Sequence, residues 1–141
     1  MILLDSNVLI DLMQGDGEWQ AWSSAAVEEG AMTDQLAVSS VVVAEVAPRS
    51  GTLADFIERI GRFGAVVVDL DNEAAYAAGS AFQAYRARRR GDPDLPRSII
   101  ADFLIGGQAL ILGAAIMTRD ARFYRRYFPF VSLITPDEAT A

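Results

Sequence analysis

The chain has 141 residues, of which 52% are hydrophobic and 22% are charged, the balance of an ordinary soluble globular domain. It contains no Cys, no His and no Lys, so all 12 basic residues are Arg, and the net charge is −7. These absences exclude a disulfide framework, zinc sites of the usual kind, a Ser-His-Asp triad, a Cys nucleophile and a His general base. Any catalysis must therefore use carboxylates, hydroxyls, Arg or a hard metal ion held by oxygen ligands.

Short apolar runs alternate along the chain with segments of helical pattern. In chain order, we predict a strand at residues 2–4, helices at 6–12 and 19–29, a strand at 36–38, helices at 40–46 and 52–63, a strand at 65–68, helices at 72–90 and 96–113, a strand at 115–117, a helix carrying residues 123–124, and a strand at 131–133. Asp, Ser and Asn residues precede several of these helices and are expected to cap them.

The predicted strands are apolar throughout and are separated by helices, a pattern typical of a parallel sheet covered on both faces. We therefore predict a single α/β domain over residues 1–141, a three-layer α/β/α sandwich with a central parallel sheet of about five strands. Ligands of such folds lie beyond the carboxyl ends of the strands, near the point where the strand order switches. That edge of the sheet is where we look for functional residues.

Neither the N-terminus nor the most apolar segment of the chain is expected to enter a membrane. The N-terminus has no basic region before its first acid, which argues against a signal peptide and favours a cytoplasmic protein. Residues 98–118 contain one charge, Asp102, but their three glycines and Gln108 favour a buried helix followed by a buried strand over a membrane span.

Two aspartates follow predicted strands. Asp5 ends the first strand and Asp120 follows the fourth. In a parallel sheet both side chains then lie on the same edge, where a catalytic site is expected. Each aspartate could instead serve only as the N-cap of the helix that follows it.

Two further acids stand in apolar surroundings. Glu45 is the only charge in residues 39–47, and Asp102 is the only charge in residues 98–105, so both carboxylates are expected to be buried. A buried carboxylate is costly unless it is paired, protonated or bound to a cation. The alternatives are an ion pair of Glu45 with Arg49 and hydrogen bonds to Asp102 from backbone or hydroxyl groups.

Carboxylates that converge on one edge of a sheet repel each other unless a divalent cation joins them. Oxygen-only ligation suits Mg²⁺ or Mn²⁺. Such an ion lowers the pKa of a bound water and stabilises charge on a phosphoryl group, and phosphodiester hydrolysis needs both effects. Ser6, Asn7 and Thr118 could orient water or phosphate, although each could also be a local turn residue.

The segments around these acids resemble the motifs of PIN-domain ribonucleases. The resemblance covers residues 2–10, 39–46, 100–105 and 118–120, in this order, and the short chain and residues 122–129 are most similar to VapC-type toxins of type II toxin–antitoxin pairs. It implies an endonuclease of single-stranded or structured RNA that needs Mg²⁺ or Mn²⁺. It also implies a homodimer that is silenced by a cognate VapB-like antitoxin.

The same resemblance implies roles for individual residues. Asp5 and Asp102 would be the principal metal ligands, and Glu45 and Asp120 would complete the acidic cluster directly or through water. The fourth acid is the most variable in the family, and here Arg119 places a positive charge beside it. Candidate substitutes for Asp120, both of which look solvent-facing, are Asp94 and Asp11.

Two groups of arginines could contact RNA phosphates. The first ends the long helix, where its charge would equally suit the helix dipole, and comprises Arg86, Arg88, Arg89 and Arg90. The second surrounds or follows the fourth acid and comprises Arg119, Arg122, Arg125 and Arg126. The acidic net charge predicts weak non-specific RNA binding and would suit a basic partner.

Two other functions remain open from the sequence. One is a phosphatase with Asp5 as covalent nucleophile, although that chemistry usually uses a second Asp two positions later, where this chain has Asn7. The other is a catalytically inactive PIN fold that acts only as a binding module. Detection of an aspartyl-phosphate would support the first function, and absence of metal binding would support the second.

Overall fold

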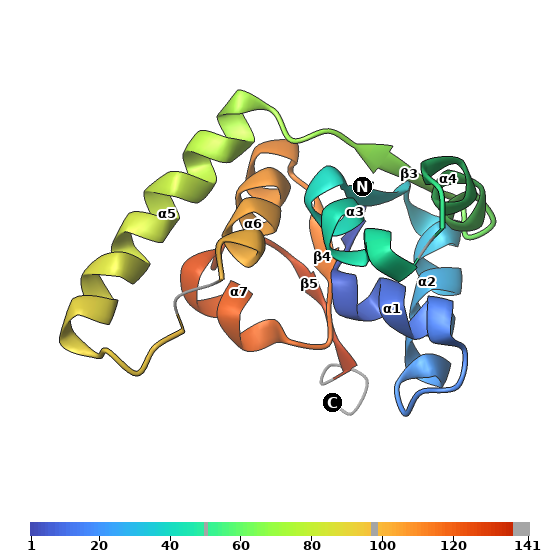
Figure 1. Cartoon of the computed structure of the whole chain (residues 1–141), viewed down its shortest axis with the longest axis horizontal. Coiled ribbons are helices and arrows are strands. Elements are labelled where there is room, and N and C mark those ends of the chain that lie inside the picture. Colours follow the sequence, from blue (N-terminus) through green and yellow to red (C-terminus); the bar gives the residue numbers. More distant parts are fainter. Residues whose placement is uncertain (50, 97–98, 137–141) are drawn as a thin grey trace.

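The computed structural model describes residues 1–49, 51–96 and 99–136 (Figure 1). The elements, in chain order, are β1 (Ile2–Leu4), α1 (Ser6–Gln14), α2 (Gln20–Thr33), β2 (Leu36–Ser39), α3 (Ser40–Val46), the 3₁₀ helix η1 (Ala47–Arg49), α4 (Leu53–Gly61), β3 (Ala65–Val68), α5 (Asn72–Gly91), α6 (Ile100–Leu112), β4 (Ala115–Met117), α7 (Ala121–Tyr127) and β5 (Leu133–Ile134). None of the helices in these ranges is long and apolar enough to cross a membrane.

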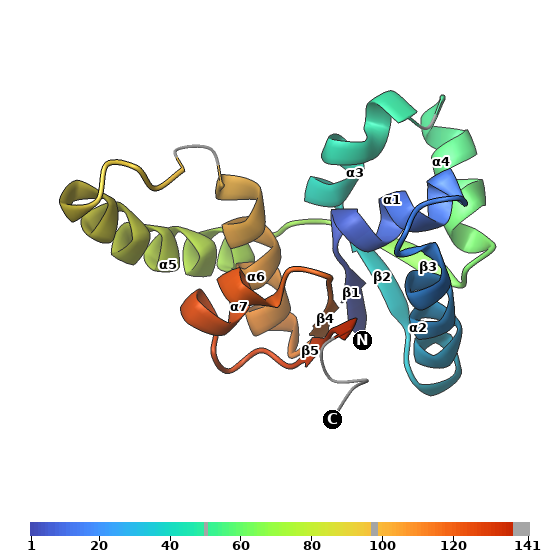
Figure 2. The same cartoon turned by 90° about the horizontal axis from the view of Figure 1, so that it is seen from below.

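The five strands form one parallel sheet in the order β3-β2-β1-β4-β5. In the central strand, Ile2 lies opposite Leu36 of β2 and Ala115 of β4. The chain leaves β1 toward β2 and later returns to its other side, so the order switches between β1 and β4. Right-handed crossovers then place α1–α4 on one face and α5–α7 on the other, the arrangement that Figure 2 shows.

The core lies between the sheet and these two helical layers. All residues of β1 and β2 are buried, as the apolar pattern of a covered parallel sheet predicts. On the second face, α5 and α6 approach closely at Gly107. A Cβ added there would lie 2.6 Å from the Ala78 nitrogen and 2.7 Å from the Ala74 oxygen, so a glycine permits this contact.

Most predicted elements are confirmed, but several boundaries differ, and helix α2 continues to Thr33 instead of ending at residue 29. The last strand begins at Leu133 and not at residue 131, because the Val131 N–H bonds to the Phe128 carbonyl in a turn. Helix α6 begins at Ile100 and not at Pro96. The Pro96 carbonyl instead accepts a hydrogen bond from the Tyr85 hydroxyl, which ties this segment to α5.

Candidate active site at the switch point

Asp5 is the first residue after β1 and is held from several directions. Its Oδ1 accepts the Ser6 N–H at 2.8 Å, which makes it the N-cap of α1. Its Oδ2 accepts the hydroxyls of Thr118 at 2.7 Å and Tyr124 at 3.2 Å. The side chain is 4% exposed. The cap predicted from the sequence is therefore present, but it uses only one of the two carboxylate oxygens.

Asp102 and Asp120 meet Asp5 around a small cavity. The cavity, of about 70 Å³, lies beyond the carboxyl ends of β1 and β4 and is lined by Asp5, Ser6, Asn7, Asp102, Asp120, Phe123 and Tyr124. Asp102 belongs to the first turn of α6 and is partly buried, whereas Asp120 is exposed. Asp120 makes no capping hydrogen bond to α7, so the simple N-cap interpretation of this residue is wrong.

Glu45 lies outside the residues that line this cavity, and the expectation of a buried side chain is wrong. Helix α3 buries Val42 and Val46, four residues apart, and leaves Ala44 and Glu45 exposed on the other side. An ion pair of Glu45 with Arg49 is not among those formed by the described residues. Glu45 nevertheless belongs electrostatically to the cluster, because partial desolvation and then the charge of Asp5 raise its pKa.

Burial and repulsion from neighbouring acids raise the pKa values of Asp5, Glu45 and Asp102. Burial, followed by repulsion from Asp5, Glu45 and Asp120, raises the pKa of Asp102 to about 6. Burial also raises the pKa of Asp5, against the opposing effect of the hydrogen bonds from Thr118, Ser6 and Tyr124. The Tyr124 pKa lies well above its usual value because the hydroxyl is buried beside these carboxylates. The site is thus a region of concentrated negative charge that a cation would relieve.

The donor set of this region fits a hard divalent cation. The polar residues that line the cavity offer carboxylate, hydroxyl and amide groups as metal ligands, and three of these residues are aspartates. Within the described ranges, no three acidic side chains are arranged so that they could hold an ion as they stand. Asp102 accepts no hydrogen bond from any residue in the same ranges.

Thr118 holds Asp5 from a buried position, and its predicted role in orienting water or phosphate stays a prediction. Its side chain is fully buried and is not among the residues that line the cavity. Its hydroxyl donates to Asp5 and accepts the Asp120 N–H at 3.0 Å and the Asn7 amide at 3.2 Å. Thr118 thus ties the ends of β1 and β4 together. Ser6 and Asn7 do reach the cavity.

Arg119 forms an ion pair with Asp11, which does not line the acidic cavity. Its Nε and Nη2 donate to Asp11 at 2.8 and 3.0 Å, and its guanidinium lies 5.7 Å from the ring centre of Trp19. Asp11 is 4% exposed and also accepts the Ser23 hydroxyl at 2.6 Å. The expectation of a solvent-facing Asp11 is therefore wrong, and the Arg119 guanidinium is engaged with Asp11, so its contact with RNA stays a prediction. Asp94 is exposed, as predicted.

Two aromatic residues of the site were not predicted from the sequence. Phe123 and Tyr124 line the cavity, and Tyr124 holds Asp5. They follow Asp120 by three and four positions, so they share its face of α7. This spacing in the sequence could have predicted that both rings lie near the site. On the same helix, Arg122 and Arg125 are exposed and form no ion pair with any described residue.

Comparison with known proteins identifies the family of the fold. A family model described as PIN domain matches residues 2–129. No match was found among curated proteins. The fold is similar to that of a VapBC2 structure from Rickettsia felis bound to a promoter DNA fragment, at 18% identity and a TM-score of 0.67, covering 96% of this chain and 98% of that chain.

Two further solved structures show the same likeness. One is DNA-bound VapBC from Salmonella typhimurium, with 24% identity, a TM-score of 0.65, and coverage of 95% of this chain and 96% of that chain. The other is FitAcB from Neisseria gonorrhoeae, with 19% identity, a TM-score of 0.60, and coverage of 96% and 98%. At these identities the likeness concerns the fold.

Proposed function

This chain belongs to the PIN domain family, and we propose that it is a metal-dependent endoribonuclease that hydrolyses phosphodiester bonds in single-stranded or structured RNA. The observation that carries this proposal is the meeting of Asp5, Asp102 and Asp120 around one cavity at the switch point of the sheet. Glu45 adds its charge, which raises the pKa of Asp102 further after burial and the charge of Asp5. Like charges gathered in this way favour a divalent cation.

In this proposal Asp5 and Asp102 are the principal ligands of Mg²⁺ or Mn²⁺, and Glu45 and Asp120 complete the acidic cluster directly or through water. The bound ion would supply Lewis acidity and charge stabilisation at the phosphoryl group. The hydroxyls of Thr118 and Tyr124 keep the Asp5 carboxylate in one orientation. Ser6 and Asn7, which line the cavity, can donate hydrogen bonds to a substrate phosphate.

We further propose that the chain is the toxin of a toxin–antitoxin pair, acts in the cytoplasm, forms a homodimer and is bound by a VapB-like antitoxin. Support comes from the likeness to VapBC and FitAcB structures, which spans nearly the full length of both chains. A toxin–antitoxin complex from Klebsiella pneumoniae shows the same likeness, with a TM-score of 0.67. Co-purification with the product of a small neighbouring gene would test the antitoxin.

The first test is calorimetric titration of Mn²⁺ into the wild type and into the Asp102→Asn variant. We expect the variant to lose most of the binding and to lose Mn²⁺-dependent cleavage of a mixed RNA pool. Asp16→Asn is the matched control, because Asp16 is an exposed acid in the loop after α1. Equal Mn²⁺ binding by the wild type and the Asp102→Asn variant would contradict the assignment of Asp102 as a ligand.

Two other functions receive less support from the geometry. A covalent role for Asp5 in a phosphatase is disfavoured, because the side chain is buried and both oxygens accept hydrogen bonds. Failure to trap an aspartyl-phosphate on Asp5 would agree with this view. The inactive binding module predicts no cleavage of any RNA even when Mn²⁺ binds, so the RNA pool assay separates it from the nuclease.

A further inference from the structure

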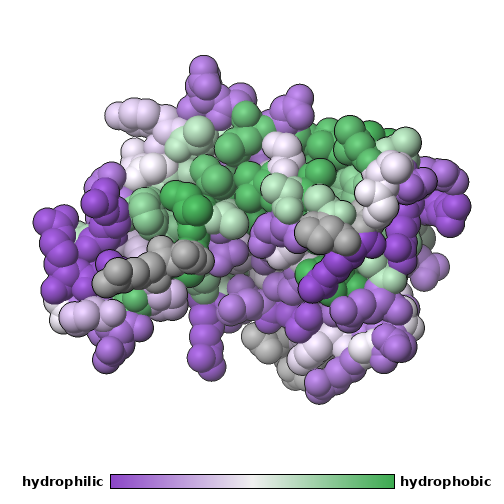
Figure 3. All heavy atoms as spheres, in the orientation of Figure 1, coloured by the Kyte–Doolittle hydropathy of each residue, from purple (hydrophilic) through white to green (hydrophobic). Residues whose placement is uncertain are grey.

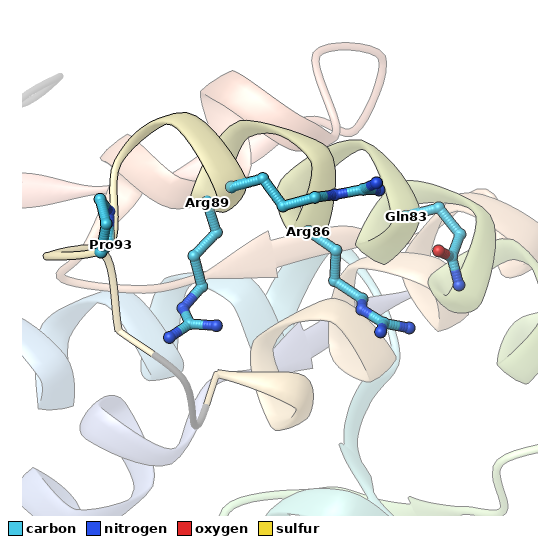
Figure 4. A pocket seen from close by; sticks show the side chains of 5 residues that line it. Gln83, Arg86, Arg89 and Pro93 are labelled. Carbon is cyan, nitrogen blue, oxygen red and sulfur yellow. The ribbon is translucent and has the colours of Figure 1, made fainter.

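The C-terminal half of α5 carries a second pocket, which we call the arginine pocket. Its volume is about 530 Å³, and it is lined by Gln83, Arg86, Arg89, Arg90 and Pro93. Figure 4 shows the guanidinium groups of Arg86 and Arg89 projecting to the same side of the helix, as a spacing of three residues allows. None of these lining residues is acidic, so positive charge is concentrated there although the net charge of the chain is −7.

The arginines of this pocket are available to an anion. Arg86, Arg89 and Arg90 form no ion pair with any other described residue. Arg89 uses its Nε to bond the Leu95 carbonyl at 3.3 Å, and its two terminal nitrogens remain for other partners. The guanidinium fork matches the oxygens of a phosphate group, and several such forks along one helix suit a chain of phosphates.

Beside the arginine pocket, Arg88 of the same helix begins a series of contacts that leads to the acidic cavity. On α5, Arg88 donates from Nη1 to the Tyr127 hydroxyl of α7 at 3.0 Å. The rings of Tyr127 and Phe123 are 5.2 Å apart between centroids, and Phe123 lines the acidic cavity. Both rings are partly exposed. Partly exposed aromatic rings flanked by arginines are typical of surfaces that bind single-stranded nucleic acid, where rings stack on bases and cations contact phosphates.

The surface of this side of the molecule agrees with such a path. Figure 3 shows hydrophilic side chains gathered over the C-terminal end of α5, in contrast to hydrophobic surface over α6 and α3. Arg122, Arg125 and Arg126 on α7 are exposed as well. A polyanion can therefore meet positive charge on the α5 and α7 side of a chain whose overall charge would repel it.

We propose that the arginine pocket binds backbone phosphates of the RNA strand whose scissile phosphate lies in the acidic cavity, with Tyr127 and Phe123 facing the bases in between. The proposal rests on the proposed ribonuclease function for the class of its ligand. It predicts that a long RNA strand gains affinity from the arginine pocket, whereas an RNA of about 4 nucleotides that fills only the acidic cavity does not.

The test is fluorescence anisotropy with labelled single-stranded RNAs of about 4 and about 20 nucleotides, in EDTA so that no cleavage occurs. The variant is Arg86→Ala with Arg90→Ala, since both side chains are exposed and the melting temperature should not change. We expect about tenfold weaker binding of the long RNA and a salt slope lower by about 1.4, at about 0.7 per lost phosphate contact. The short RNA should bind the variant and the wild type equally weakly, because the acidic cavity repels phosphate when no cation is present.

The matched control is Arg49→Ala with Arg62→Ala, which removes the same charge from exposed positions in η1 and beside α4. Equal weakening by the control pair, or unchanged affinity in the pocket variant, would overturn the proposal. Binding of a poly-glutamate peptide to the arginine pocket that RNA does not displace would also overturn the proposal. Because binding is measured without cleavage, failure of the ribonuclease function would appear separately, as RNA that binds but stays intact when Mn²⁺ is added.

Discussion

At the carboxyl end of β1, one carboxylate accepts hydrogen bonds from its own helix, from the residue after β4 and from α7. Asp5 is held by Ser6, Thr118 and Tyr124, and it is buried enough that each of these bonds offsets part of the cost of its charge. The orientation of the Asp5 carboxylate therefore depends on side chains and backbone groups from three separate parts of the chain.

We expect Thr118→Val to lower the free energy of unfolding by about 1.5 to 3 kcal/mol, because it removes a buried hydrogen bond to a charged group. Chemical denaturation would measure the change. Thr118→Ser keeps the hydroxyl and should retain most of the stability and Mn²⁺ affinity. A Thr118→Val variant as stable as the wild type would show that this hydroxyl does not hold Asp5.

The raised pKa of Asp102 predicts how stability depends on pH without metal. Because its pKa is about 6 in the folded protein against an ordinary value of 3.8, the folded protein binds more protons in this range than the unfolded chain. Stability in EDTA should therefore fall as the pH rises from about 4 to about 6, and Asp5 and Glu45 act in the same direction. Thermal melts would show a flatter profile for Asp102→Asn; an unchanged profile would contradict the assignment.

At the scale of elements, the contact between α5 and α6 places Asp102 and the arginine pocket on neighbouring helices. This contact is closest at Gly107, where any side chain would overlap the backbone of α5 at Ala74 and Ala78. The interior of this layer leaves no room for an added methyl group, since packed cores deform little.

We expect Gly107→Ala to lower the free energy of unfolding by about 1 to 3 kcal/mol, because the helices must separate. Gly79→Ala is the control in the same layer. Gly79 lies within α5, and a Cβ added there would meet no atom within 4 Å, so alanine should stabilise the helix by about 0.5 to 1 kcal/mol. Denaturant titration of both variants tests the pair, and opposite signs are the expected result.

At the scale of the whole molecule, a group of exposed apolar side chains lies near the start of α5, and the arginines lie at the other end of that helix. The last turn of α6 exposes Leu110, Ile111 and Leu112, and Tyr76 of α5 is 81% exposed beside Ile111. Exposed apolar side chains that gather in this way favour contact with another protein surface. The proposed homodimer would use this region and leave the arginines of α5 and α7 free.

We therefore expect Ile111→Glu to shift the protein toward the monomer, because a carboxylate at the contact would lose its solvation. Light scattering at several concentrations measures the change in mass. Leu53→Glu is the control, since Leu53 is also exposed, at 63%, but begins α4 on the other face of the sheet. Equal mass for the wild type and Ile111→Glu would contradict this location of the interface.

Local patterns were sufficient for most of the fold and for the three aspartates that line the candidate site, but they placed the exposed Glu45 in the interior. The caps at Asp5, Ser39 and Asp71 depend on a few neighbouring residues, and each is present. The boundary of α6 was not predictable, because the Pro96 carbonyl is bound by Tyr85 from another helix. Competition of this kind cannot be recognised in a window of a few residues.

By itself, the sequence determined the parallel α/β architecture, because the apolar pattern of the strands is a property of the chain alone. The missing Cys and His also limit possible metal ligands to oxygen atoms. The same sequence predicted that Asp5, Asp102 and Asp120 lie at one edge of the sheet, where they line one cavity. Only the tertiary structure decided which partners meet across more than one hundred residues. Arg119 reaches Asp11 and Tyr124 reaches Asp5 because β4 lies beside β1 in the sheet. The physical reason is that strand order, and not sequence distance, sets which ends of the chain come together.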